Sequence, residues 1–337
     1  MNQQFFIAVG SGFAAALLFF IPVKGTAFAM MLAMFAALPI MIVGLAFRPA
    51  AAFISAVTGT FALLFGLMLL VDVDLAPALI FCSFFAFTAA FPGWWLTRLA
   101  WLARPPAENE TPASDGLVWY PLGRLAMWTA ILSAGAVSLG LLAAIVRSGS
   151  FDIFVTESAG RIQPIIEKLF GGPRGLPGGL QASELARTFV MATGPIMAAW
   201  TAAGLALNLW IAGRVARASG QMQRPWLAVP EHLELPREIL PALAVSFALM
   251  LLEGFPRALG TIGVASIVVL LMFKGLAGLH ASTRASGART AILAAVYILL
   301  LVLFPLPLPL FAALGLAAMF PKSARRPPAP PAPRNDN

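Results

Sequence analysis

The sequence predicts an all-α protein whose helices form a polytopic transmembrane bundle. Of its 337 residues, 60% are hydrophobic and only 11% are charged, and the mean hydropathy is +0.88. A soluble domain typically carries about 25% charged residues. The composition therefore excludes a soluble globular enzyme and a disordered protein, and the single cysteine, Cys82, excludes a disulfide scaffold. A transmembrane β-barrel is disfavoured, because its strands alternate apolar and polar residues.

Apolar segments of helical length can be traced along the whole chain. They cover residues 5–21, 27–47, 50–71, 75–96, 122–146, 185–215, 239–252, 259–279, a stretch from about 290, and 310–320. Alternate prolines at 305, 307 and 309 end the ninth segment, because proline cannot continue an undisturbed helix. We expect about eight to ten crossings, with ten preferred.

The segments group into two membrane units. Residues 1–103 are expected to form an N-terminal four-helix unit, followed by a loop over 104–118 that prolines and charges keep out of any helix. Residues 119–321 form the C-terminal membrane unit, which includes an extracytoplasmic loop over 147–184. The proline-rich basic tail, 322–337, is expected to be disordered.

The 147–184 loop contains an amphipathic pattern. Ile162, Ile165, Ile166 and Leu169 recur at helical spacing with polar residues between them, which predicts a short helix lying in the membrane interface. The glycine-rich run over 171–179 lacks the Lys-Ser/Thr pair of a phosphate-binding loop, and we interpret it as a connector.

The basic residues predict the orientation of the chain. The net charge is +8, and the arginines gather in alternate short loops and in the tail rather than in one patch, which favours topology signals over nucleic-acid binding. The positive-inside rule then places both termini in the cytoplasm of a bacterial inner membrane, provided that the number of crossings is even.

Motifs for autonomous chemistry are missing from the sequence. His232 and His280 are the only histidines and belong to no metal-ligand cluster, so we expect no metal and no other cofactor. No Walker motif and no nucleophile elbow are present. We therefore expect a non-enzymatic protein without its own ATPase.

A few polar or aromatic residues inside the apolar segments are candidates for substrate binding. They are Asn208, Trp210, Lys274 and His280. A buried amide such as that of Asn208 must bond another helix or a ligand. Lys274 can snorkel to the interface or face a cavity as a buried cation. His280 lies near a helix C-terminus, where the helix dipole favours a cation, so a structural role competes with a binding role.

Other residues have two interpretations each. Arg214, Arg217 and Arg224 can anchor the chain at the interface or contact a partner protein or lipid phosphates. Asp72 and Asp74 can be a solvated pair or a cation site. Small residues permit close helix contacts. They are Gly10, Gly12, Ala14, Ala15, Ala16, Ala136 and Gly140.

Several stretches carry a resemblance to a known family. The run Leu38-Pro39-Ile40-Met41-Ile42-Val43-Gly44-Leu45-Ala46-Phe47-Arg48-Pro49 resembles the second helix and following turn of YybS-like bacterial membrane proteins, a family of unknown function (domain of unknown function 2232). Residues 119–124, Asn208-Leu209-Trp210 with Arg214, Arg217, Ala218, Ser219 and Gly220, and Leu279-His280 with Thr283-Arg284 resemble its alphaproteobacterial branch. The N-terminal half is more loosely similar to the substrate-binding subunits of energy-coupling-factor vitamin importers.

These observations lead to two expected functions. The first is a transport or solute-binding membrane subunit that binds a small molecule and meets a partner membrane or ATPase subunit. The second is a non-transporting scaffold for an envelope-assembly complex. A lipid-modifying enzyme is a third class, for which only Glu253 and His280 are near candidates. A cavity of several hundred Å3 would favour the binder, and a solid bundle the scaffold.

Overall fold

The structure, a computed structural model, describes residues 2–21, 25–108, 110–170, 172, 180–222, 224–225, 232–303 and 307–320. Its elements are α1 (Asn2–Phe20), α2 (Ala27–Ala33), α3 (Leu38–Ala46), α4 (Pro49–Leu70), α5 (Leu75–Phe85), the π-helix η2 (Ala86–Ala90), α6 (Phe91–Ala100), β1 (Ala103–Arg104), β2 (Val118–Trp119), α7 (Leu122–Ser148), α8 (Phe151–Leu169), α9 (Ala182–Ala218), α11 (Ile239–Met250), α12 (Gly254–Ser282), α13 (Arg289–Val302) and α14 (Leu308–Ala317). The prediction of an all-α bundle is confirmed.

Seven helical stretches are long and apolar enough to cross a membrane, among the described residues. They correspond to the first six predicted segments and the eighth. The other three predicted segments form α11, α13 and α14, of 12, 14 and 10 residues. At 1.5 Å per residue these helices span about 18, 21 and 15 Å, so none of them crosses a hydrocarbon core of about 30 Å on its own.

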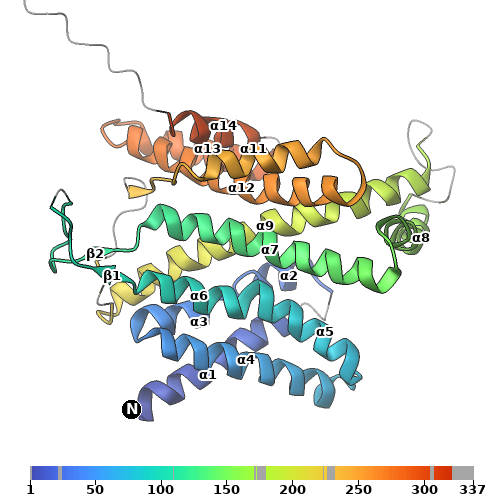
Figure 1. Ribbon diagram of the computed structural model, residues 1–337, viewed down its shortest axis with the longest axis horizontal. Coiled ribbons are helices and arrows are strands. Elements are labelled where there is room, and N and C mark those ends of the chain that lie inside the picture. Colours follow the sequence, from blue (N-terminus) through green and yellow to red (C-terminus); the bar gives the residue numbers. More distant parts are fainter. Residues whose placement is uncertain are drawn as a thin grey trace, which may run out of the picture.

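The helices stack in three layers (Figure 1). The N-terminal group, α1 to α6, forms one layer, α7 and α9 form the middle, and α11 to α14 form the third. Helix α9 packs against α3 on one side and against α7 and α12 on the other. Its buried residues Leu205 and Leu209 belong to the core of the N-terminal group. The single continuous helix α9 therefore packs against helices of both predicted membrane units.

The amphipathic helix predicted within residues 147–184 is present and is longer than expected. It is α8, which packs on the start of α9 through Ile166, Ala182 and Ala186. In Figure 1 it is seen end-on at the right, so its axis runs across the bundle rather than along it. Ile165 and Leu169 stay 66% and 77% exposed, which suits an apolar face turned toward lipid.

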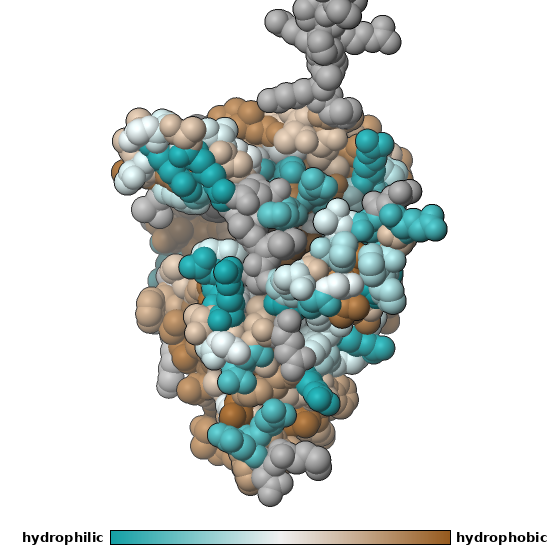
Figure 2. Space-filling view, turned by 90° about the vertical axis from the view of Figure 1, so that its left-hand side faces the viewer, coloured by the Kyte–Doolittle hydropathy of each residue, from teal (hydrophilic) through white to brown (hydrophobic). Residues whose placement is uncertain are grey.

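The opposite end of the bundle carries the β1–β2 hairpin. Ala103 pairs with Trp119 and Arg104 with Val118 in an antiparallel register. Arg104 and Glu110 form an ion pair of 2.5 Å inside this loop, and the contact raises the pKa of Arg104 and lowers that of Glu110. Figure 2 looks onto this end, where hydrophilic side chains are scattered among hydrophobic ones.

Glycines allow three pairs of helices to approach closely. A Cβ added at Gly12 on α1 would lie 2.5 Å from the Ser55 carbonyl oxygen on α4, and beside this contact the Ser55 hydroxyl donates to Ser11 at 3.1 Å. A Cβ at Gly260 would meet α11, and one at Gly275 would meet α14. The predicted close contact at Gly12 is confirmed, whereas Gly10 and Gly140 have nothing within 4 Å.

We predict that Gly12→Leu lowers the stability of the bundle. The new side chain would meet the α4 backbone, which cannot rotate away as a side chain can, so overpacking should cost about 3 kcal/mol. Gly10→Leu, on the same helix with open space around it, is the matched control. Melting of both variants in detergent, followed by size-exclusion chromatography, checks this. Equal melting of the two variants would contradict the α1–α4 packing.

Candidate functional site

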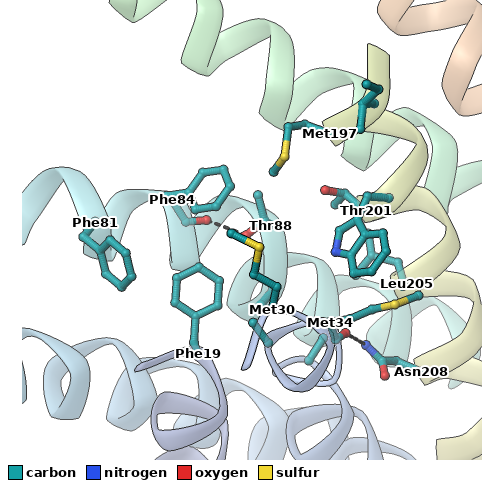
Figure 3. A pocket seen from close by; sticks show the side chains of 16 residues that line it. Phe19, Met30, Met34, Phe81, Phe84, Thr88, Met197, Thr201, Leu205 and Asn208 are labelled. Carbon is teal, nitrogen blue, oxygen red and sulfur yellow. Dashed lines mark hydrogen bonds between the residues drawn. The ribbon is translucent and has the colours of Figure 1, made fainter. Parts of the chain in front are cut away.

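A pocket of about 350 Å3 lies between the N-terminal group and α9 (Figure 3). One wall comes from the end of α1 and from α2 with the turn that follows it, a second from α5 and η2, and the third from the middle of α9. Its lining residues are Phe19, Met30, Ala33, Met34, Ala37, Phe81, Phe84, Thr88, Ala89, Ile196, Met197, Trp200, Thr201, Gly204, Leu205 and Asn208. The volume falls within the usual range for small-molecule sites.

The first wall contains a helix interruption. Pro39 has no N–H, so the Phe35 carbonyl cannot receive its regular helical bond. The Leu38 N–H bonds Phe35 instead, at 3.0 Å, and the helix breaks over residues 34–37 between α2 and α3. Met34 and Ala37, from this break, line the pocket.

The second wall contains a widened helical turn, and the third contains a proline within a continuous helix. Pro92 follows η2, where the Phe91 N–H reaches back to the Ala86 carbonyl in the wider π-helical turn. Thr88 and Ala89 of this turn line the pocket. On α9, Pro195 stands inside the helix, directly before the lining residues Ile196 and Met197. The break before α3, the π-helical turn η2 and the Pro195 region of the continuous helix α9 therefore border one pocket.

Asn208 connects α9 to the break in the first wall. Its Nδ2 donates to the Met34 carbonyl at 2.7 Å, and the side chain is 1% exposed. Gly204, one turn earlier on α9, makes room for Met34, because a Cβ there would lie 3.1 Å from Met34 Cγ. The prediction that Asn208 must bond another helix or a ligand is confirmed for the helix. Within the described chain, the Asn208 Oδ1 is buried and accepts no hydrogen bond.

The other three predicted binding residues lie outside this pocket. Trp210 is 45% exposed on the outer surface of α9. Lys274 donates to the Leu233 carbonyl at 2.5 Å, which ties α12 to the segment before α11. His280 Nε2 is 2.8 Å from the Tyr297 hydroxyl, between α12 and α13. The structure thus brings only Asn208 to the pocket.

The three arginines predicted as partner or lipid contacts do not share one surface. Arg214 and Arg217 are exposed near the end of α9. Arg224 is 8% exposed and donates from Nη1 to the Ala100 carbonyl at 2.8 Å and from Nη2 to the Tyr120 carbonyl at 2.7 Å. It therefore ties the end of α6 to the start of α7. Burial lowers the pKa of Arg224 to about 10, which leaves the guanidinium charged at neutral pH.

A second hollow, of about 850 Å3, lies at the end of the bundle near the N-terminus. Its polar side chains are Gln3, Gln4, Arg48 and Gln221. Gln3, Gln4 and Arg48 are exposed, so this hollow is continuous with the surface. In the part of the chain that the structure describes, no group of three or more histidine, cysteine or acidic residues could hold a metal ion.

Most of the pocket residues could not be predicted from the sequence. Met34, Thr88 and Thr201 give no signal, because none of these residues is unusual inside an apolar helix. The available signal was the position of Pro39, Pro92 and Pro195 within three predicted spans. Proline in a spanning helix frees carbonyl groups that must find other partners, and this requirement marks places where helices depart from regular geometry.

We predict that Asn208→Leu destabilises the contact between α9 and the α2–α3 break. The Met34 carbonyl loses the donor that Asn208 supplies, which should cost about 1–2 kcal/mol. Detergent melting measures the loss, and Thr188→Ala, an exposed position on the same helix, serves as the control. An unchanged melting temperature for Asn208→Leu would mean that the amide does not hold this junction.

We also predict that Arg224→Lys lowers stability by about 2 kcal/mol, because an ammonium group cannot reach two carbonyls with the geometry of a planar guanidinium. Arg214→Lys should melt like the wild type, because Arg214 is exposed. If both variants melted alike, the bonds from Arg224 to α6 and α7 would contribute nothing to stability.

Comparison with known proteins returned no match: no protein-family model, no curated protein and no solved structure is significantly similar to this chain.

Proposed function

We propose that this protein is a transport or solute-binding subunit of a bacterial inner membrane and that it holds a small molecule in the pocket between α2, η2 and α9. We also propose that it belongs with the YybS-like membrane proteins, on the residues that carry that resemblance. The sequence has no Walker motif, so any ATP hydrolysis that drives transport is supplied by a partner chain.

The convergence of the α2–α3 break, the η2 turn and Pro195 at one pocket supports this proposal. Irregular backbone at membrane depth is tolerated where it is buried in protein or lines a cavity, and transporters build their binding sites from such broken helices. A π-helical turn is likewise common at functional sites. A scaffold needs rigid helices and gains nothing from a break and a widened turn beside one hollow.

The charge distribution supports a cytoplasmic location for the end that carries the β1–β2 hairpin. Figure 1 shows the N-terminus and this hairpin at the same end of the bundle. The turns and helix ends on that side contain eight of the arginines: Arg48, Arg98, Arg104, Arg124, Arg214, Arg217, Arg284 and Arg289. The α4–α5 turn at the other end has Asp72 and Asp74 and no basic residue.

We predict from this distribution that both termini are cytoplasmic, which requires that the short apolar helices and their flanking residues add an odd number of crossings to the seven long candidate spans. Reporter fusions within residues 104–112 and after Asn337 should both report cytoplasm, as the positive-inside rule requires. A fusion within the α8–α9 connection, residues 172–180, is the control and should report the outside. A periplasmic signal after Asn337 would contradict the proposed orientation.

We predict that Ala33→Phe prevents a small molecule from binding in the pocket. Ala33 lines the hollow on α2, and a phenyl group there would fill space that a solute needs. Native mass spectrometry of protein purified in mild detergent should find a bound small molecule on the wild type and not on the variant. Ala248→Phe, on the exposed face of α11, is the matched control and should keep the molecule.

The same measurement separates the two function classes. The scaffold would be supported if the wild type carried partner chains but no small molecule, and if Ala33→Phe also carried none. That result would contradict solute binding.

A further inference from the structure

The pocket lining excludes charge from the part of a ligand that it holds. All 16 lining residues are apolar, aromatic or neutral polar side chains. An ionised group moved from water into such surroundings without a partner is strongly disfavoured. The aromatic rings of Phe19, Phe81 and Phe84 together with the flexible side chains of Met30 and Met34 suit an apolar body of irregular shape.

The rim of the pocket faces the side of the bundle rather than its ends. Met30 is 61% exposed, Phe84 is 43% exposed and Ile196 is 60% exposed, and each belongs to a candidate membrane span. Large apolar side chains exposed on spanning helices lie against hydrocarbon. A ligand therefore reaches the pocket sideways from the bilayer.

One hydroxyl group inside the pocket is available to a ligand. Thr201 is 9% exposed, and Figure 3 shows its oxygen directed into the hollow toward the side of Thr88. The hydroxyls of Thr188 and Thr193, earlier on α9, each bond the carbonyl four residues back at 2.9 Å. Thr88 likewise bonds the Phe84 carbonyl at 2.6 Å. Within the described residues, the Thr201 hydroxyl makes no hydrogen bond.

We propose that the pocket binds a neutral lipid that bears a single hydrogen-bonding oxygen, as in a lipid alcohol or ketone, and that this oxygen bonds the Thr201 hydroxyl. The apolar body of the lipid lies among the aromatic and methionine side chains. This proposal rests on the proposed function, because it names the class of ligand for the same pocket.

The test uses the full chain in vesicles of phosphatidylethanolamine and phosphatidylglycerol, with a diazirine analogue of farnesol as the probe. We expect photolabelling on peptides that line the pocket, competed by farnesol and not by farnesyl diphosphate, which has the same chain with a charged head. Thr201→Val removes the hydroxyl at nearly constant shape and should weaken labelling about fivefold. Thr193→Val, whose hydroxyl is already bonded to its own helix, is the control and should label like the wild type.

Three results would overturn this ligand class. The first is equal labelling of Thr201→Val and the wild type, and the second is competition by farnesyl diphosphate as strong as that by farnesol. The third is a phospholipid retained equally by the wild type and Thr201→Val, which would indicate an acyl chain in the pocket. If the farnesol probe fails while Ala33→Phe still loses another bound molecule, solute binding stands and the neutral-lipid proposal falls. If neither the probe nor any molecule occupies the wild type, the proposed function falls as well.

Discussion

The structure depends on one constraint: a backbone carbonyl inside a membrane must find a donor within the protein. Pro39 and Pro92 stand beside departures from regular helix, and each departure is accompanied by a local change of bonding: Leu38 bonds Phe35, and Phe91 reaches back to Ala86. The amide of Asn208, on the continuous helix α9, reaches across to the Met34 carbonyl. Only this last bond joins separate helices, so α9 and the α2–α3 break are positioned together.

The sequence predicted helices far better than it predicted contacts. Apolar composition over about 20 residues is a local property, so the long spans could be located directly. The short segments 239–252 and 310–320, which form α11 and α14, were located as well, but composition alone does not decide whether so short an apolar helix crosses the membrane. Asn208 was found because an amide inside an apolar run needs a partner wherever it points. Trp210 stands only two residues later, yet it faces outward, because helical geometry turns it away from Asn208.

The sequence also does not show which glycines contact a neighbouring helix. Gly10 and Gly12 stand two residues apart on α1, but only Gly12 faces the α4 backbone. Gly260, Gly275 and Gly315 make comparable contacts in the third layer, and no local pattern distinguishes them from Gly140, which faces open space. Which small residue faces a neighbour depends on how the helices are rotated about their axes, and that rotation is a property of the whole bundle.

The α2–α3 break, the η2 turn and Pro195 also affect the mechanics of the bundle. A helix resists bending through its continuous ladder of axial hydrogen bonds; a break or a widened turn weakens that ladder locally, and a proline removes one donor from it. All three positions lie around the same hollow, so α2, α5 and α9 are most compliant at the depth of the pocket. A bulkier guest can then be accommodated by bending the walls outward, while the close-packed layers on either side keep their side-chain arrangement.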